Sequence, residues 1–210
     1  PRPSPRLRLG FVSAAFKEHP ETRLIVGLLE ALDSDRFDVY AYALRAADAT
    51  PLRDRVMSAT HAFREVECMA SDRIAAIIRD DAIDVLFDLT GHTAHSRPDV
   101  FATRPAPVQI NFLGYAGTLG AAYYDYVITD DYTTPADQQV HFDERFLPLA
   151  PCYLPSDPKR RIEPAPSRAS DGLPAAPSVF MSQAAPYKFL PAVFDPWAAI
   201  HAAARCHLLW

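Results

Sequence analysis

The chain has 210 residues, of which 49% are hydrophobic and 22% are charged. These proportions are typical of a globular protein, and a chain of this length can bury the core of one domain, or of one domain and part of another. The net charge of −5 excludes a global basic field that would recruit nucleic acid. No stretch approaches the roughly 18 to 20 apolar residues of a membrane span, and the first residues lack the apolar segment of a signal peptide.

The cysteines and prolines narrow the class of protein further. Cys68, Cys152 and Cys206 stand at wide, unrelated spacings, which fit neither a disulfide framework nor a zinc motif. A reducing cytoplasm is therefore the expected compartment. The 20 prolines are about twice the usual share of roughly 5%, and 15 of them lie from Pro98 onward. This distribution argues against a helical bundle in the second half, because proline breaks helix interiors.

The first half alternates apolar strand-like runs with helical segments. Helices are predicted at 19–32, 52–59 and 71–79, with Ser71 as the N-cap of the third. Strands are predicted at 7–13, 37–44, 61–66, 83–89, 108–113, 126–129 and 146–149. Strands separated by helices of about ten residues are typical of parallel βαβ units, so we expect an open α/β sheet.

The α/β pattern begins again near the end of the chain. A strand at 178–182, a helix from Pro196 to 203 and a strand at 206–210 are predicted. A parallel sheet that stopped there would have uncovered faces, so we expect the truncated start of a second α/β domain. The predicted organisation is an N-terminal lobe over 1–147, a proline-rich connection over 148–177 and the beginning of a second lobe over 178–210.

Three loops should carry the chemistry, because ligands of open α/β sheets bind beyond the carboxyl ends of the strands. These loops are 14–20, 90–97 and 114–120. In the first, His19 precedes Pro20 at a strand-to-helix junction, where an imidazole can act as a base or donate to a bound oxygen. The alternative is an ordinary exposed loop histidine.

The other two loops are polar and glycine-rich. His92 and His95 have a spacing that suits a metal, but Asp88 and Asp99 form no ligand-like pattern beside them, so a polar ligand-facing loop is favoured over a metal site. The glycines of 114–120 allow close approach of the backbone to a ligand, or simply a tight turn. This loop lacks the Gly-Lys-Ser/Thr ending of a phosphate-binding P-loop.

Several stretches together resemble the catalytic region of protein O-GlcNAc transferases and the related SPINDLY-type proteins. They are LRLGFVSAAFKEHP, IDVLFDLTGHTAHSRPDVFATRPAPVQINFLGYAGTLGAAYYDYVITD and CYLPSDPKR. The resemblance runs from about Leu7 to Trp210, and Gly91–Asp130 is its most diagnostic part. VFMSQAAPYKFLPAVFDPWAAIHAAARCHLLW is similar to the opening of the family's second catalytic lobe. The resemblance implies a GT-B fold, in which two Rossmann-like lobes hold a nucleotide sugar in the cleft between them.

The resemblance also implies inverting, metal-independent transfer of a sugar from UDP-GlcNAc to Ser/Thr hydroxyls of proteins, with no cofactor. Without a metal, the leaving diphosphate must be stabilised by a lysine and helix N-terminal N–H groups. Lys188 resembles the family's diphosphate-binding lysine, and Tyr187 precedes it as in relatives. By position alone, a solvated lysine would be the favoured interpretation of Lys188. His19 and Pro20 resemble the active-site His-Pro motif, where the histidine is a base candidate or contacts donor or acceptor.

Two loops resemble those that contact the donor. Their residues are Leu113, Gly114, Tyr115, Gly117 and Thr118 in one loop, and His92 and Thr93 in the other. The chain departs from the family at Ala116, where a proline is usual, at Ala15, where many members carry Asp, and at 183–186 before the Tyr-Lys pair. The residues that bind uridine and ribose, and the tetratricopeptide repeats that present acceptors, fall outside this chain.

Three interpretations remain open at this point. The first is a fragment of a protein O-GlcNAc transferase that is inactive alone, because half of the nucleotide site is missing. The second is a transferase of the same family that uses GDP-fucose or UDP-glucose. The third is a non-catalytic remnant or binding module, which the alanines at Ala15 and Ala116 favour.

Overall fold

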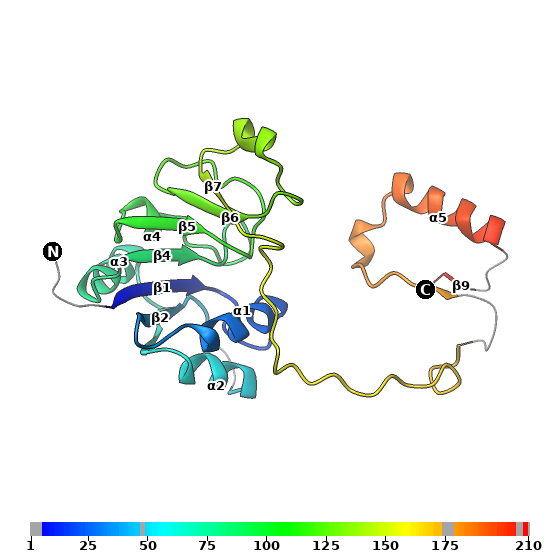
Figure 1. Ribbon diagram of the computed structural model, residues 1–210, viewed down its shortest axis with the longest axis horizontal. Coiled ribbons are helices and arrows are strands. Elements are labelled where there is room, and N and C mark those ends of the chain that lie inside the picture. The colour runs from blue at the N-terminus through cyan, green and yellow to red at the C-terminus, as the bar shows by residue number, and fades with distance from the viewer. Residues whose placement is uncertain (1–5, 47–48, 174–178, 205–207, 210) are drawn as a thin grey trace. The chain divides into compact units, whose positions relative to one another are not determined.

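A computed structural model describes residues 6–46, 49–173, 179–204 and 208–209 of the chain. The chain forms two compact units, Pro1–Arg160 and Arg161–Trp210 (Figure 1).

The first unit is a seven-stranded parallel sheet with helices on both faces. Its strands are β1 (Leu7–Ser13), β2 (Phe37–Ala43), β3 (Ala62–Glu65), β4 (Val85–Asp88), β5 (Val108–Asn111), β6 (Tyr126–Thr129) and β7 (Arg145–Pro148). Its helices are α1 (Pro20–Ala31), α2 (Pro51–Ser58), α3 (Ser71–Asp80), α4 (Pro98–Ala102) and the 3₁₀ helix η1 (Ala136–His141). The strand order is β3-β2-β1-β4-β5-β6-β7 and every ladder is parallel, which confirms the predicted open α/β sheet.

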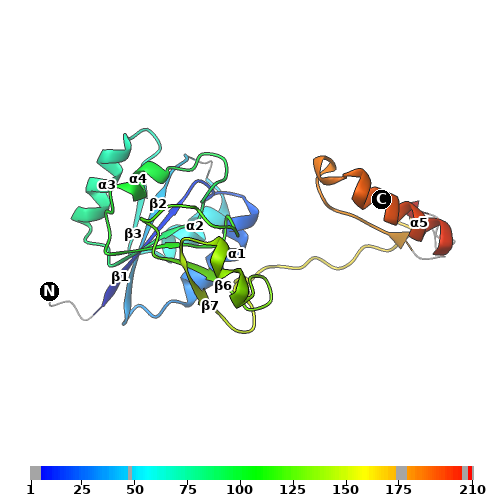
Figure 2. The same ribbon diagram turned by 90° about the horizontal axis from the view of Figure 1, so that it is seen from above.

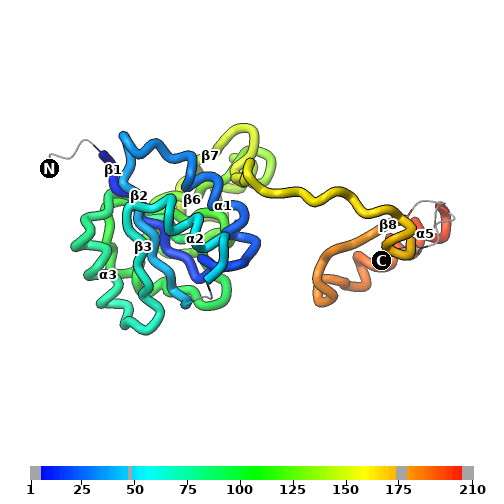
Figure 3. The backbone as a smooth tube through the Cα atoms, turned by 90° about the horizontal axis from the view of Figure 1, so that it is seen from below, coloured from blue at the N-terminus to red at the C-terminus, as the bar shows by residue number. Residues whose placement is uncertain are grey.

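Successive residues of the central strands point to opposite faces of the sheet and fill two separate cores. On one face, Phe11 of β1 is buried with Ile25 of α1 and Val56 of α2. On the other face, Tyr42 of β2 is buried with Ile74 of α3. Helices α3 and α4 lie side by side (Figure 2), as do α1 and α2 (Figure 3). The near-continuous apolar character of β1 and β2 therefore reflects burial on both faces.

The strand order reverses between β1 and β4, which makes this pair the topological switch point of the sheet. Connections leave the two strands toward opposite faces there, so the loops that follow them open a crevice. The loop that follows β5 borders the same crevice, because β5 pairs with β4. The three loops predicted to carry chemistry thus lie at the edge where ligands bind in this fold.

Helix α3 begins differently from the prediction. Ser71 is its first helical residue rather than its N-cap, which is Ala70 without a capping side chain. The Ser71 hydroxyl instead donates to Asp99 and accepts from Arg97 Nε at 3.1 Å. Charged side chains at the start of α4 therefore outcompete the local capping bond. Helices α4 and η1 had no counterpart among the predicted elements.

The second unit contains a short βαβ arrangement. Its elements are β8 (Val179–Phe180), the 3₁₀ helix η2 (Pro186–Lys188), α5 (Pro191–Ala204) and β9 (Leu208–Leu209), and β8 pairs in parallel with β9. The predicted strand–helix–strand order is confirmed, although parts of both predicted strands (178, 206, 207 and 210) lie outside the described residues.

The predicted start of the last helix is wrong. Helix α5 begins at Pro191 and contains Pro196 in its interior. A proline does occupy the first helical position, as expected, but it is Pro191 and not the predicted Pro196. The Leu190 carbonyl accepts the N–H groups of Val193 and Phe194 at 2.9 Å, which closes the first turn before Pro196 is reached.

The chain that follows β7 stays on the first unit up to Arg160. Arg55 of α2 donates two hydrogen bonds to Asp157 (2.7 and 2.9 Å) and two to Glu30 of α1 (2.8 and 2.9 Å). Gly27 of α1 makes room for this segment, since a Cβ there would stand 2.9 Å from the Asp157 Cα. The start of the proline-rich segment 148–177 is thus fixed to α1 and α2, and its role as a connection between lobes stays a prediction.

Candidate active site

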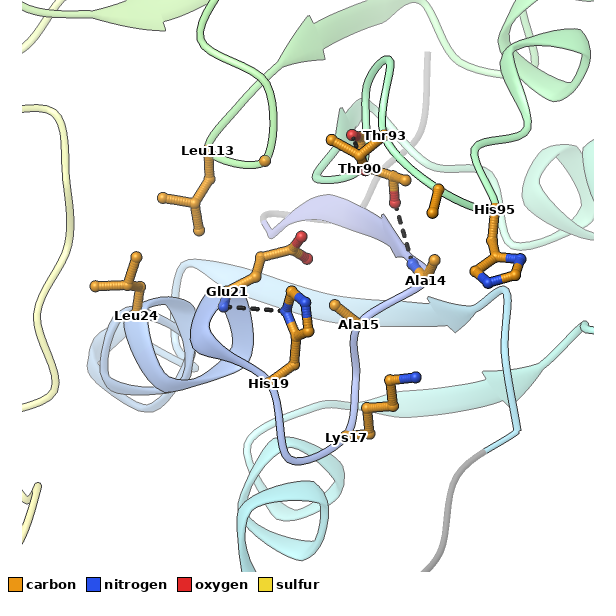
Figure 4. Close-up of a pocket in the computed structure, with 12 residues that line it drawn as sticks. Ala14, Ala15, Lys17, His19, Glu21, Leu24, Thr90, Thr93, His95 and Leu113 are labelled. Carbon is orange, nitrogen blue, oxygen red and sulfur yellow. Dashed lines mark hydrogen bonds between the residues drawn. The ribbon is translucent and has the colours of Figure 1, made fainter. Parts of the chain in front are cut away.

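A pocket of about 530 Å³ opens at the carboxyl ends of β1, β4 and β5 (Figure 4). Its lining comes from three segments. The segment after β1 contributes Ala14, Ala15, Lys17, His19, Glu21 and Leu24. The segment after β4 contributes Thr90, Thr93, Ala94 and His95, and the segment after β5 contributes Leu113 and Gly114. The structure therefore brings together the three loops singled out from the sequence, including the predicted site residues His19, Thr93, Leu113 and Gly114.

Buried hydrogen bonds fix the loop that follows β1. The hydroxyl of Ser13, the last residue of β1, donates to Glu21 Oε1 at 2.5 Å and accepts the Ala15 N–H at 2.9 Å. The Ala14 N–H donates to Thr90 Oγ1 at 3.0 Å, which joins this loop to the one after β4 (Figure 4). The pocket wall is thus held in place before any ligand arrives, as catalytic geometry requires.

His19 is the N-cap of α1, and Pro20 is the first residue of the helix. The His19 backbone is extended (φ −147°, ψ 147°), and its Nδ1 accepts the Glu21 N–H at 3.2 Å. Burial, and then the charge of Lys17, lower the pKa of His19, so the neutral ring is favoured. A neutral ring that accepts at Nδ1 carries its proton on Nε2. Of the two predicted roles, this arrangement favours donation to a bound oxygen over proton abstraction.

Glu21 is the functional candidate that the sequence did not reveal. Its side chain comes from the first turn of α1 and lies in the pocket wall, yet the residue is only 9% exposed. Burial raises the pKa of Glu21 from 4.5 to about 7, and the negative charge of Asp88 adds to this rise, while the Ser13 hydrogen bond opposes it. An acidic residue in a first helical turn ordinarily indicates complementarity to the helix dipole. Only the three-dimensional structure shows that this one is buried.

Gly114 lets the loop after β5 approach the pocket closely. A Cβ at this position would stand 1.9 Å from the Leu89 carbonyl oxygen and 3.1 Å from Glu21 Oε2. Leu113, just before it, has a left-handed backbone (φ 77°), which is strained for a branched side chain. The backbone of this loop is therefore presented directly to whatever occupies the pocket, which is one of the two uses that the glycine-rich pattern predicted.

The loop after β4 is organised by Asp88, a buried carboxylate at the end of that strand. Its Oδ1 accepts the N–H groups of Thr90 and Gly91 at 2.9 Å, and its Oδ2 accepts the Tyr124 hydroxyl at 2.7 Å. Burial raises the pKa of Asp88 despite these bonds. The Thr93 hydroxyl donates to the Thr90 carbonyl at 2.7 Å. Asp88 thus fixes the loop conformation, and both of its carboxylate oxygens already accept hydrogen bonds from the protein.

The remaining predicted residues of the first unit build the loops and do not line this pocket. His92 Nε2 lies 3.1 Å from the Leu119 carbonyl, and its ring stands edge-on to that of Tyr115 at 5.3 Å. Gly91 permits this arrangement, because a Cβ there would stand 2.6 Å from Tyr115 Cβ. Donor contacts of His92 and Tyr115 stay predictions.

Thr118 and Gly117 are likewise engaged inside the protein. The Thr118 hydroxyl donates to Glu144 Oε2 at 2.7 Å, and Glu144 is fully buried. The Gly117 carbonyl accepts Asn111 Nδ2 at 2.9 Å. Their predicted donor contacts also stay predictions.

Tyr187 and Lys188 belong to the second unit, where η2 ends three residues before α5 begins at Pro191. Both side chains are exposed, and Lys188 Nζ lies 5.9 Å from the centre of the Tyr187 ring. The ammonium is therefore available to a ligand within its own unit. Its predicted contact with a diphosphate stays a prediction.

The described residues do not show the pattern of a three-ligand metal site. Nowhere among them do three His, Cys, Asp or Glu side chains gather as a metal cluster would. Cys68 and Cys152 are free and exposed, whereas Cys206 lies outside the described residues. No helix in the described ranges is long and apolar enough to cross a membrane.

A doubly wound parallel sheet with a pocket at its switch point, followed by a second unit with a short βαβ arrangement, is an arrangement found in GT-B type glycosyltransferases. Residues 2–163 match the family described as Glycosyl transferase family 41. The chain belongs to this family.

Similar proteins agree with this assignment. A probable UDP-N-acetylglucosamine–peptide N-acetylglucosaminyltransferase, SEC of Arabidopsis thaliana, is 35% identical over 98% of this chain. The UDP-N-acetylglucosamine–peptide N-acetylglucosaminyltransferase of Caenorhabditis elegans is 36% identical over 71% of it. The structure of a mutant O-GlcNAc transferase of Thermobaculum terrenum superposes with a TM-score of 0.87 at 32% identity, covering 97% of this chain and 38% of that one. The chain spans only 22% and 13% of the lengths of the Arabidopsis and Caenorhabditis relatives.

Proposed function

We propose that this chain forms the N-terminal catalytic lobe, and the beginning of the second lobe, of a protein O-GlcNAc transferase. The enzyme transfers N-acetylglucosamine from UDP-GlcNAc to Ser and Thr hydroxyls of proteins, with inversion and without a metal. The observation that carries the proposal is the preorganised pocket at the switch point, in a chain whose relatives are named for this reaction.

In the proposed mechanism, the sugar occupies the pocket beside Leu113 and Gly114. His19 donates from Nε2 to an oxygen of the donor or the acceptor, as its capping geometry favours. The acceptor hydroxyl attacks the anomeric carbon from the face opposite the diphosphate, and the bond between that carbon and the diphosphate oxygen breaks. The electron pair leaves with the diphosphate, and the family resemblance assigns the stabilisation of that charge to Lys188.

The proposed setting is the cytoplasm, and the proposed partners are a nucleotide sugar and protein acceptors. The exposed free thiols of Cys68 and Cys152 support a reducing compartment. We propose that no nucleic acid takes part, in keeping with the net charge of −5. The 210-residue chain alone should not transfer sugar, because the family's uridine-binding residues fall outside it.

A donor screen tests the proposed function. The whole protein encoded by the reading frame that contains this chain is incubated with protein acceptors and labelled UDP-GlcNAc, UDP-glucose or GDP-fucose. We expect labelling from UDP-GlcNAc, its loss in Lys188→Ala and its retention in Lys159→Ala, a matched change at another exposed lysine. Turnover of GDP-fucose or UDP-glucose alone would reject the donor, and calorimetry without any UDP binding would favour a non-catalytic module. Labelling by the 210-residue chain alone would refute its predicted inactivity.

A further inference from the structure

Glu21 has one carboxylate oxygen held and the other free. Oε1 accepts the Ser13 hydroxyl, and the same hydroxyl accepts the Ala15 N–H. No group in the described part of the chain bonds to Oε2. The carboxylate extends from α1 toward the space between Leu113 and Thr90 (Figure 4). A glutamate of which only 9% is exposed, with one carboxylate oxygen open to the pocket, indicates a partner that arrives with the substrate.

We propose that Glu21 is the general base of the transfer, and this inference rests on the proposed function. Glu21 Oε2 accepts the proton of the acceptor Ser or Thr hydroxyl as the hydroxyl oxygen forms its bond to the anomeric carbon. The bond from that carbon to the diphosphate breaks and its electrons leave with UDP. Glu21 ends the step as a neutral carboxylic acid, and it returns the proton to solvent after the products leave.

The other ionisable groups around Glu21 are less suited to this role. Lys17 carries an ammonium, which donates. His19 has its Nδ1 engaged by the Glu21 N–H, so its neutral ring offers a donor. Asp88 faces Glu21 from β4, but both of its oxygens are occupied and it does not line the pocket. His95 lies across the pocket from Glu21 (Figure 4) and is the rival that the experiment must separate.

The electrostatic surroundings match the proposed task. A general base works best when its pKa lies near the working pH, and burial brings the pKa of Glu21 to about 7. The Ser13 hydrogen bond lowers this pKa and also fixes the direction of the free oxygen. Ser13 is therefore a positioning residue for Glu21, and removing its hydroxyl should raise the pKa of the base without removing the base.

The experiment measures kcat and KM for UDP-GlcNAc in the whole protein from pH 5.5 to pH 9, with saturating acceptor. Wild type should lose activity as pH falls through about 7. Glu21→Gln should lose roughly 10²- to 10⁴-fold in kcat, with KM changed only a few-fold and the acidic limb abolished. Ser13→Ala should keep activity at high pH and move the acidic limb upward. Glu18→Gln, a matched change at an exposed glutamate of the same loop, should leave the profile unchanged.

Three results would overturn the inference. Glu21→Gln could keep kcat within about threefold of wild type, or raise only KM, which would make Glu21 a sugar-binding group. The acidic limb could move in His95→Gln and not in Glu21→Gln, which would assign the base to His95. Absence of transfer by wild type from every donor would overturn the proposed function itself and the inference with it. The first two results leave the proposed function standing.

Discussion

Replacing Glu21 by Gln should stabilise the protein at neutral pH while it weakens catalysis. Glutamine keeps the shape of the side chain and can still accept the Ser13 hydroxyl through Oε1. It carries no charge, so it avoids the cost of holding a buried carboxylate beside Asp88. The substitution therefore separates what the carboxylate costs the fold from what it contributes to the reaction.

The size of this effect follows from proton linkage. The pKa of Glu21 rises from 4.5 in the unfolded chain to about 7 in the folded protein, which at about 1.4 kcal/mol per pKa unit is a cost of about 3 kcal/mol. Below pH 4.5 both states hold the proton and the cost is absent. Between pH 4.5 and 7 only the folded state holds it, so stability falls as pH rises. Above pH 7 the cost has reached its full value.

Urea unfolding of the 210-residue chain at a series of pH values measures this cost. Glu21→Gln should unfold with nearly the wild-type free energy close to pH 4.5 and should exceed it by about 3 kcal/mol at pH 8. Glu18→Gln should follow wild type throughout, since Glu18 is exposed. Free energies for Glu21→Gln and wild type that run parallel from pH 5 to 8 would show that the Glu21 carboxyl titrates alike in the folded and unfolded states, contrary to this prediction.

Substitutions at Gly114, His19 and Arg55 test the construction of the pocket and the segment beside it. Gly114→Ala should destabilise the chain by more than about 3 kcal/mol in urea unfolding. As a control, Gly120→Ala, where φ is positive but the space around the Cβ is open, should cost about 1 kcal/mol. Equal costs would show that the clash between a Cβ at position 114 and the Leu89 carbonyl has no effect on stability. His19→Ala should lose about 1 kcal/mol of stability and His19→Asn should recover most of it, unless the capping bond contributes nothing. Arg55→Ala should lower the free energy of unfolding by about 1–3 kcal/mol and raise the pKa of Asp157. It should also speed amide hydrogen exchange over residues 153–160. Unchanged exchange would show that the ion pair between Arg55 and Asp157 does not hold this segment on the first unit.

Much of the fold could be predicted because it depends on local pattern. The strand Leu7–Ser13 was predicted residue for residue, and alternation of strands with helices sufficed for a parallel sheet. The errors arose where a distant or competing group decides the local structure. Ser71 bonds to Asp99 in the first turn of α4 instead of capping its own helix. Two prolines five residues apart could each begin the last helix, and Pro191 is the one that does.

The site was predicted at the level of loops, not of every side chain. Switch-point topology places the loops after β1, β4 and β5 together whatever their residues are, and the pocket lies there. Which side chains face it depends on contacts between residues far apart in the sequence. Thr118 is held by Glu144, and His92 lies against the Leu119 carbonyl. The place of Glu21 in the pocket was not predicted, because the sequence does not show whether an acidic side chain in the first turn of a helix points inward or outward.

Photochemical labelling tests most directly the claim that the switch-point pocket holds the sugar. The whole protein is irradiated with a UDP-GlcNAc analogue that carries a diazirine in its N-acyl group, and labelled peptides are identified by mass spectrometry. We expect labels within residues 14–24, 90–95 or 113–114, and their suppression by excess UDP-GlcNAc. Suppressible labels confined to segments outside these three stretches would contradict it.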